Sequence, residues 1–234
     1  AQAFTIAWLS DTQNYHNAYK PIFDGMTQWI ADNREALDIR FVFHTGDVVG
    51  SWSSEDQWRQ ARESMGILSS ASIPFLAACG NHDIGYRMNY ANFLKYVLSL
   101  RPASMSQEYG DTGSRYELFS ANGRDYIFMG IAFSNKGPSE DEVNWINGVL
   151  RQYSSRDAII ITHSYLKKSA SYTTQGKAIF EKIVKANPNV FLVLCGHCRD
   201  ISYKNVQLDD DGDGDPDRTV YAILSNFQGS KAGG

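Results

Sequence analysis

Short apolar segments that run directly into polar residues are the feature of this chain that most constrains its fold. Such segments, rich in β-branched and aromatic residues and ending in turn-forming residues, predict buried strands. They cover residues 4–10, 39–47, 73–83, 157–164 and 189–197. Helical spacing of apolar residues lies between them, at 22–37, 54–70, 89–100, 139–153 and 173–186. This alternation predicts an α/β fold in which helices cover a mostly parallel or mixed sheet.

The polar residues at the predicted strand ends are of types that bind metals or transfer protons. They are Asp11 and Gln13, then Asp47, then Asn81, His82 and Asp83, then His163, and finally His197. Because sites in open α/β sheets form outside the carboxyl ends of strands, we expect these side chains to meet at one rim. The glycines before Asp47, Asn81 and His197 are interpreted as sharp backbone turns. Singly, each residue is a weak signal, since an Asp after a strand is most often a turn former.

Two further features extend this picture. The segments 114–133 and 201–227 read as β-hairpins and predict a second, antiparallel layer. The length of 234 residues fits one domain over 1–234 that we expect to be monomeric, with 229–234 predicted to be a disordered tail. A net charge of −4 without any block of Lys or Arg argues against a nucleic-acid-binding surface. No apolar run reaches the roughly 18 to 20 residues that a membrane span needs.

The combined order Asp-x-Gln, Gly-Asp, Gly-Asn-His-Asp, Thr-His and Gly-His resembles that of the calcineurin-like metallophosphoesterase superfamily, over residues 5–226. The stretches "SDTQNY", "GNHD" and "NPNVFLVLCGH" are similar to those of secreted bacterial members. The resemblance implies a four-layer α/β/β/α sandwich of mixed sheets. It also implies a two-metal hydrolase of phosphomonoesters or phosphodiesters that uses metal-activated water. Such members usually continue into one more strand, so the resemblance implies that 1–234 lacks it.

The resemblance also assigns roles to residues. Asp47 would bridge two cations from among manganese, iron, zinc and magnesium. The first cation would take Asp47, Asn81, His163 and His197, and the second would take Asp11, Gln13 and Asp47. His82 would stay unligated, as a proton donor to the leaving group or a clamp on the phosphoryl oxygens. Asp83 would orient the His82 imidazole.

Two positions depart from the pattern of the superfamily. Gln13 replaces a His, although its amide oxygen can still bind a hard cation. Arg199 stands where the last His ligand would be, and a guanidinium has no lone pair for a metal. Three alternatives follow: the second cation binds loosely, or Arg199 replaces its charge and binds the substrate phosphate as a catalytic group, or Arg199 pairs with Asp11 and closes the site. The last would leave a metal- or phosphate-binding module.

The stretch Cys195-Gly196-His197-Cys198 also matches a thiol–disulfide redox motif. Redox chemistry of this kind needs the first Cys at the start of a helix. Residues 199–208 instead alternate with a period of two, which favours a strand. We therefore favour the metal interpretation, with Cys198 as an alternative ligand in place of the missing His.

Asp209, Asp211, Asp213 and Asp215 form an acidic loop that resembles the start of a calcium-binding loop. The Glu expected at its twelfth position is replaced by Val220. The loop is thus either a solvated hairpin tip or a structural calcium site. The opening Ala1-Gln2-Ala3 has the small-x-small pattern that remains after signal cleavage, with an expression artefact as the alternative. It predicts an extracellular or cell-envelope location.

Overall fold

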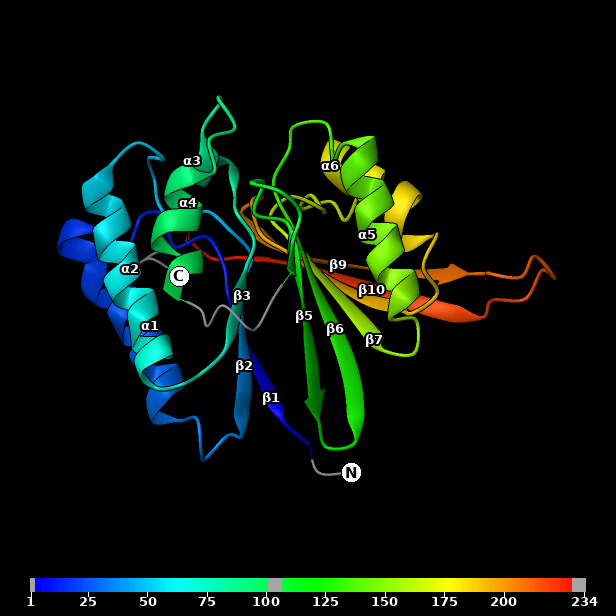
Figure 1. Cartoon of the computed structure of the whole chain (residues 1–234), viewed down its shortest axis with the longest axis horizontal. Coiled ribbons are helices and arrows are strands. Elements are labelled where there is room, and N and C mark those ends of the chain that lie inside the picture. Colours follow the sequence, from blue (N-terminus) through cyan, green and yellow to red (C-terminus); the bar gives the residue numbers. More distant parts are fainter. Residues whose placement is uncertain (1–2, 101–106, 229–234) are drawn as a thin grey trace.

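Two β-sheets form the centre of the molecule in the computed structural model, which describes residues 3–100 and 107–228 (Figure 1). The smaller sheet has the parallel order β1-β2-β3, with β1 at Thr5–Leu9, β2 at Ile39–His44 and β3 at Phe75–Ala77. The larger sheet has the order β4-β5-β6-β7-β8-β10-β9. Its strands are β4 Gln107–Glu108, β5 Arg115–Ala121, β6 Arg124–Ile131, β7 Asp157–Thr162, β8 Val190–Cys195, β9 Asp200–Leu208 and β10 Arg218–Asn226. The predicted α/β class is confirmed, while the predicted tail at 229–234 lies outside the described residues.

The two predicted hairpins are present, but the expectation that they form a separate antiparallel layer is wrong. β5 pairs antiparallel with β6, and β9 with β10. β6 and β10 each also pair in parallel, β6 with β7 and β10 with β8. Each hairpin therefore extends the parallel centre of the larger sheet, where it satisfies backbone groups that a sheet edge would expose.

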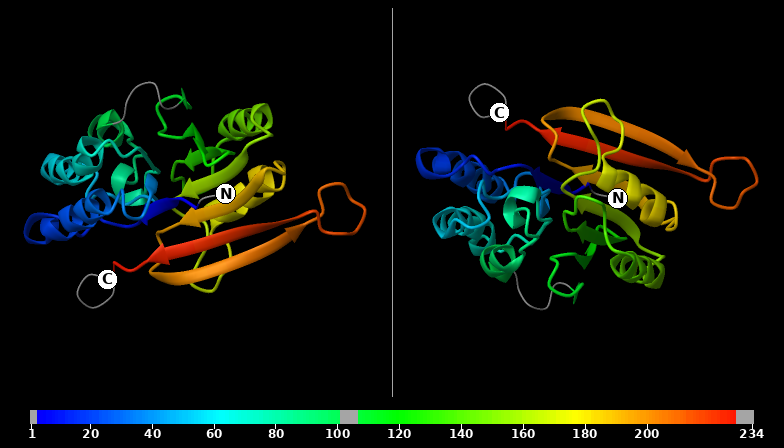
Figure 2. Two further views of the ribbon diagram at one scale, coloured as in Figure 1. Left: turned by 90° about the horizontal axis from the view of Figure 1, so that it is seen from below. Right: turned by 90° about the horizontal axis from the view of Figure 1, so that it is seen from above.

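Helices cover the outer faces of both sheets (Figures 1 and 2). The helices α1 Lys20–Asp32 and α2 Glu55–Ser70 lie on the smaller sheet, and α5 Glu140–Gln152 and α6 Thr174–Ile179, followed by the π-helix η3 Phe180–Val184, lie on the larger one. Shorter elements are η1 Asn17–Tyr19, α3 Asn81–Ile84, α4 Ala91–Tyr96 and η2 Leu98–Leu100. The starts of α2, α5 and α6 are capped by the side chains of Ser54, Ser139 and Thr173. None of the helices in the described ranges combines the length and apolar character needed to cross a bilayer.

Three apolar clusters fill the space between these layers, and residues of β2 belong to two of them. Val42 packs in the cluster below α1 and α2, whereas Phe41 and Phe43 point the other way, into the cluster between the sheets. There, the ring of Phe128 on β6 lies 4.8 Å from the rings of both Phe41 and Phe43, measured between centroids. A strand buried on both faces needs a continuous apolar run, which explains the sequence of 41–43, whereas Arg40 before it is exposed. The sheets are thus packed face to face at a fixed spacing.

Glu142 lies in the first turn of α5, and its carboxylate is buried. It is 7% exposed. The Ser114 hydroxyl donates to Glu142 Oε1 at 2.5 Å and accepts from the backbone N–H of Ala132 at 2.8 Å. Burial raises the pKa of Glu142 above its usual range, and the hydrogen bond from Ser114 offsets this only in part. The folded state therefore holds the Glu142 proton more tightly than the unfolded chain does.

We expect this carboxylate to make the protein less stable as pH rises. Between the unfolded and folded pKa values of Glu142, the folded state binds more protons, so the free energy of unfolding falls with increasing pH. Above about pH 4.5, the ordinary pKa of a Glu carboxyl, the free energy of unfolding of Glu142→Gln should therefore fall less with rising pH than that of the wild type. Urea denaturation at a series of pH values measures it. Glu140→Gln, on the same turn but with a side chain 75% exposed, is the matched control and should keep the wild-type fall.

Candidate metal centre

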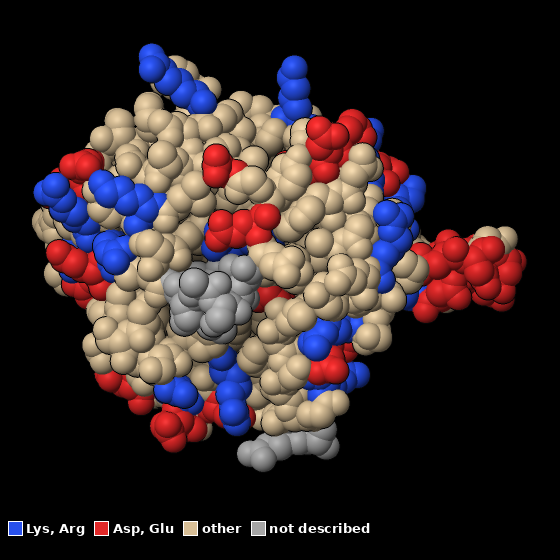
Figure 3. All heavy atoms as spheres, in the orientation of Figure 1, with Lys and Arg blue, Asp and Glu red and all other residues tan. Residues whose placement is uncertain are grey.

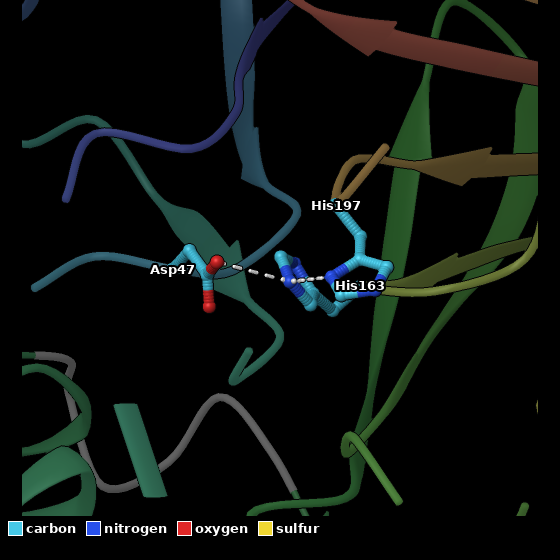
Figure 4. Close-up of side chains that lie close together, drawn as sticks. All are labelled: Asp47, His163 and His197. Carbon is cyan, nitrogen blue, oxygen red and sulfur yellow. Dashed lines mark hydrogen bonds and ion pairs between the residues drawn. The ribbon is translucent and has the colours of Figure 1, made fainter. Parts of the chain in front are cut away.

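Side chains from both sheets converge at the carboxyl ends of their strands (Figure 4). Asp47 follows β2, His163 follows β7 and His197 follows β8, and one ligand atom of each lies within 4.8 Å of the other two. The Nε2 atom of His163 is 3.2 Å from Asp47 Oδ2, 3.1 Å from Asn81 Oδ1 and 3.1 Å from His197 Nδ1. The structure therefore brings together the four side chains predicted for the first cation.

This crowding around His163 Nε2 fits a divalent cation better than a set of hydrogen bonds. An imidazole nitrogen carries at most one proton, so it can donate to only one of its three neighbours at a time. Ligand atoms about 2.1 Å from an octahedral cation lie about 3 Å apart when their bonds are perpendicular. The observed spacing matches that value. Carboxylate, amide and imidazole groups are also the ligand types that manganese, iron, zinc and magnesium accept.

The His163 ring is fixed by a contact that only the tertiary structure reveals. The ring is completely buried, and its Nδ1 lies 2.9 Å from the backbone carbonyl oxygen of Thr45. Since a carbonyl only accepts, Nδ1 carries a proton, so the lone pair of the neutral ring would lie on Nε2, which faces Asp47. A hydrogen bond from the second ring nitrogen to a carbonyl is typical of metal-binding histidines. The sequence gives no signal for it, because every residue has a backbone carbonyl.

Asp47 lies between His163 and Gln13. Its Oδ1 accepts from the backbone N–H of His82 at 2.9 Å, and its Oδ2 accepts from Gln13 Nε2 at 3.1 Å. The other amide atom of Gln13, Oε1, is buried and has no hydrogen-bond partner among the described residues. A buried polar atom without a partner costs about 1–3 kcal/mol, and a bound cation would satisfy it. The position of Asp47 agrees with the predicted bridging role, which stays a prediction.

Asp11 follows β1 and is completely buried beside the cluster. The backbone N–H of His197 lies 3.2 Å from both Asp11 carboxylate oxygens, and the Ser10 hydroxyl donates to Oδ2. The backbone of Asp11, Asp47 and His197 is left-handed, with φ of 53°, 54° and 70°. Non-glycine residues rarely adopt this conformation, which concentrates at functional sites. The same turns that strain the backbone direct these side chains to the rim.

The glycines before the polar residues have two different roles. Gly46 has φ of 100° and makes the predicted sharp turn. Gly80 has φ of −102°, so the predicted reason is wrong there, and Gly196 likewise does not lie in the left-handed region. A Cβ atom at Gly80 would overlap the Asp47 carboxylate, and one at Gly196 would overlap the Asp11 carboxylate. Both are glycine because the buried carboxylates occupy the space of a side chain.

Burial and mutual charge shift the pKa values of these groups. Burial raises the pKa of Asp11 to about 6. Burial opposes a charge on His163, but the Asp47 and Asp11 carboxylates outweigh it and raise its pKa to about 9. Burial and the charge of His163 lower the pKa of His197 to about 4. Without a metal, the proton held by His163 partly neutralises the buried Asp47 and Asp11 carboxylates. A cation would have to displace this proton, so the affinity for the metal should fall as pH falls.

The structure places His82 and Asp83 apart, which corrects the role predicted for Asp83. The His82 ring is exposed, and its Nδ1 lies 2.9 Å from the Gly50 carbonyl oxygen. Asp83 is completely buried and accepts from the backbone N–H groups of Val48, Val49 and Gly80 at 2.8, 3.0 and 2.8 Å. Neighbours in α3 point in different directions, so the carboxylate turns inward. Asp83 ties the loops after β2 and β3 together, and the Gly50 carbonyl orients His82.

Arg199 is exposed and forms no ion pair with Asp11 or with any other residue in the described ranges. The alternative in which it closes the site by pairing with Asp11 is therefore not seen.

Cys198 lies outside the group of converging ligand atoms and packs against the cluster below α5, which disfavours it as a substitute ligand. Cys195 is buried at the end of β8, and burial raises the pKa of its thiol to about 12. Since β9 rather than a helix follows, the structure does not support redox chemistry.

The acidic loop lies far from this centre, at the tip of the β9–β10 hairpin (Figures 1 and 3). The hairpin begins beside His197 and carries the loop to the other end of two nine-residue strands. Carboxylate oxygens of Asp209, Asp211 and Asp217 lie within 4.8 Å of one another. The predicted set is thus partly wrong, because Asp213 and Asp215 lie outside this group and Asp217 joins it. Calcium binding there stays a prediction.

We expect Gly196→Ala to weaken metal binding, because the added Cβ would displace the Asp11 carboxylate from its place beside His197. The affinity for Mn²⁺, measured by titration calorimetry, should fall at least about tenfold, a loss of about 1.4 kcal/mol. Gly148→Ala, in the middle of α5, is the matched control, since its Cβ would meet no atom within 4 Å. Circular dichroism checks that both variants fold. Wild-type Mn²⁺ affinity in folded Gly196→Ala would show that Asp11 does not depend on this space.

The centre can be compared with known proteins. A Bacillus subtilis (strain 168) protein of unknown role, YvnB, is 41% identical over 235 residues, which cover 99% of this chain and 18% of YvnB. The chain thus spans about a fifth of the length of the curated relative it matches.

Solved structures show the same fold at low identity. A dimetal phosphatase from Danio rerio superposes with a TM-score of 0.62 at 14% identity, covering 94% of this chain and 86% of its own. A purple acid phosphatase from yellow lupin gives 0.57 at 15% identity, covering 94% and 43%. A 5′-nucleotidase from Candida albicans gives 0.54 at 14% identity, covering 96% and 46%. Residues 4–198, which include every ligand predicted for the two catalytic cations, match the calcineurin-like phosphoesterase family, and the chain belongs to that family.

Proposed function

We propose that this chain is a metal-dependent hydrolase of phosphomonoesters or phosphodiesters. The observation that carries the proposal is the convergence of Asp47, Asn81 and His197 on a single nitrogen of His163. Such a set has no use in a packed core, where the same residues would each need a separate hydrogen-bond partner. Membership of the phosphoesterase family supports the choice of reaction.

In this proposal, the ligands form two neighbouring cation sites that share Asp47. Asn81, His163 and His197 complete the first. Asp11 and Gln13 serve the second, where the unpartnered Gln13 oxygen is the free ligand atom. Bound divalent cations supply an acidified water as nucleophile and positive charge for the phosphoryl oxygens.

His82 acts from outside the ligand set in this proposal. Its Nδ1 donates to the Gly50 carbonyl, so only Nε2 can reach a substrate. In the imidazolium form, Nε2 donates a proton to the leaving oxygen or a hydrogen bond to the phosphoryl group. Its backbone N–H meanwhile holds Asp47, so the segment that delivers the proton donor also positions a ligand.

Arg199 is the group that separates a hydrolase from a binding module. A guanidinium that forms no ion pair among the described residues remains available to bind phosphate oxygens in a bidentate manner. That arrangement, with a weakly held second cation, suits the proposed hydrolase. The binding-module alternative requires Arg199 to neutralise Asp11, and the Asp11 carboxylate instead accepts from Ser10 and from the backbone of His197.

Metal content and turnover test the proposal directly. Protein purified without chelator should hold at least one divalent cation per chain, by elemental analysis, and should hydrolyse bis(4-nitrophenyl) phosphate. Chelation should abolish turnover, and manganese should restore it. Asp47→Asn should lose both metal and turnover, while Asp56→Asn on the exposed start of α2 keeps both. Arg199→His should bring the metal content closer to two. Bound metal without hydrolysis of either aryl monoesters or aryl diesters would favour the binding module.

The role of His82 can be read from the leaving group. A 4-nitrophenolate leaves without protonation, whereas an alkoxide needs a proton. If His82 is the proton donor, His82→Gln should lower kcat about tenfold for a 4-nitrophenyl ester and about 10² to 10⁴-fold for an alkyl ester. Equal losses for the two esters would identify His82 as a phosphoryl clamp instead. Asp56→Asn on the exposed start of α2 is again the control and should affect neither ester.

A further inference from the structure

A cavity opens directly beside the metal centre and shares His197 with it. Its volume is about 310 Å³, and three segments form its walls: the loop after β6, the loop between β7 and α6, and the end of β8. This volume lies at the lower end of the range for small-molecule pockets. The cavity therefore has room for one small group attached to a phosphoryl group at the metals.

Most of the residues that line this cavity are polar, and hydrogen bonds hold its walls in place. Gln175 accepts from the backbone N–H of Ser134 at 3.2 Å and donates to the Ala132 carbonyl at 2.8 Å, so α6 is joined to the loop after β6. The hydroxyls of Ser164 and Thr173 lie 3.1 Å apart and close the wall next to His163. Because these groups already have partners, the shape of the cavity is set before any ligand enters.

Lys167 gives this cavity its charge. It is the one cation among the described residues that line it, and no Asp or Glu lines it. Lys167 forms no ion pair with any residue of 3–100 or 107–228. The adjacent Lys168 is different, since its ammonium group pairs with Asp200. Of these two neighbouring lysines, Lys168 is thus neutralised by an ion pair, and Lys167 is available to an anion in the cavity.

The backbone of Lys167 is fixed more firmly than that of an ordinary exposed lysine. Its N–H donates to the Ser171 carbonyl at 2.8 Å, and its carbonyl accepts from the Ser202 hydroxyl at 2.8 Å and from the Ala170 N–H at 2.9 Å. A β-bridge between Leu166 and Tyr172 closes the same loop. The loop therefore holds the base of the Lys167 side chain at the cavity, which lowers the entropy lost when an anion binds.

We propose that this cavity binds the organic group that is esterified to the phosphate of the substrate. Lys167 then selects phosphoesters in which this organic group is small, polar and negatively charged. The inference rests on the proposed hydrolase function and adds the substrate class. The hydroxyl and amide groups of the walls suit a polar group. Lys167 adds a charge-assisted contact that an uncharged ester group of the same size lacks.

Two matched diesters test this selectivity: 2-carboxyethyl 4-nitrophenyl phosphate and 3-hydroxypropyl 4-nitrophenyl phosphate, which are similar in size and differ by one charge. Because Lys167 is exposed to solvent, the manganese-loaded protein should prefer the carboxylate ester by about 2- to 5-fold in kcat/KM. Lys167→Met should reduce the preference to about one. Lys168→Met, the matched control on the next residue, should keep it. Rescue of the preference in Lys167→Arg would tie the effect to the positive charge.

Three results would overturn the inference: no preference in the wild type, a preference retained in Lys167→Met, or an equal loss in both methionine variants, which would indicate only the general field of the surface. Failure of the proposed function looks different, since neither ester would then be hydrolysed by any variant. In that case, calorimetric binding of the same two esters decides the matter. Tighter binding of the carboxylate ester that disappears only in Lys167→Met supports the cavity, and equal binding of the two esters refutes it.

Discussion

The hydrogen bond from His163 Nδ1 to the Thr45 carbonyl is the interaction on which the candidate centre depends. His163 belongs to the larger sheet, and Thr45 follows β2 of the smaller sheet. The bond directs Nε2 at Asp47 and Asn81, which also come from the smaller sheet, and at His197, which comes from the larger one. The centre therefore exists only where the two sheets are packed together, and the aromatic contacts of Phe128 with Phe41 and Phe43 set that packing.

Buried charge is the main cost of this arrangement. Asp11, Asp47 and Asp83 are all buried within the same few loops. Each is compensated by backbone N–H groups: those of His197, of His82, and of Val48, Val49 and Gly80, respectively. Backbone donors are rigid and carry no side-chain entropy, so they hold carboxylates in place better than flexible lysines would.

Lys167 and Arg199 add positive charge at the outer side of this acidic centre. Neither forms an ion pair with another described residue, although the chain carries a net charge of −4. In the proposed function the substrate is an anionic phosphoester that would approach buried carboxylates. Cations at the rim would reduce that repulsion and favour one orientation of the substrate. Lys168 is paired with Asp200, whereas Lys167 forms no ion pair with a described residue. The availability of a lysine charge therefore depends on its position and not on the lysine content of the chain.

Much of the centre could be predicted from residues that are local in sequence. Strand ends are readable from apolar runs, and the types of residue that follow them identify Asp11, Asp47, Asn81, His163 and His197 as partners at one rim. The errors arose where the answer depends on where a side chain points. Asp83 is adjacent to His82 but turns away from it, and Asp217 rather than Asp213 joins the acidic group.

The sequence by itself determined the α/β class, the order of the strand ends and the departure at Arg199, because these follow from residue type and short-range periodicity. Only the tertiary structure decided that both hairpins extend one sheet, that the Thr45 carbonyl orients His163, and that Lys167 faces a cavity while Lys168 is paired. These depend on contacts between residues that are far apart in the chain or on the direction of one side chain. Neither leaves a periodic signal, since backbone carbonyls are common to all residues and neighbouring lysines read alike.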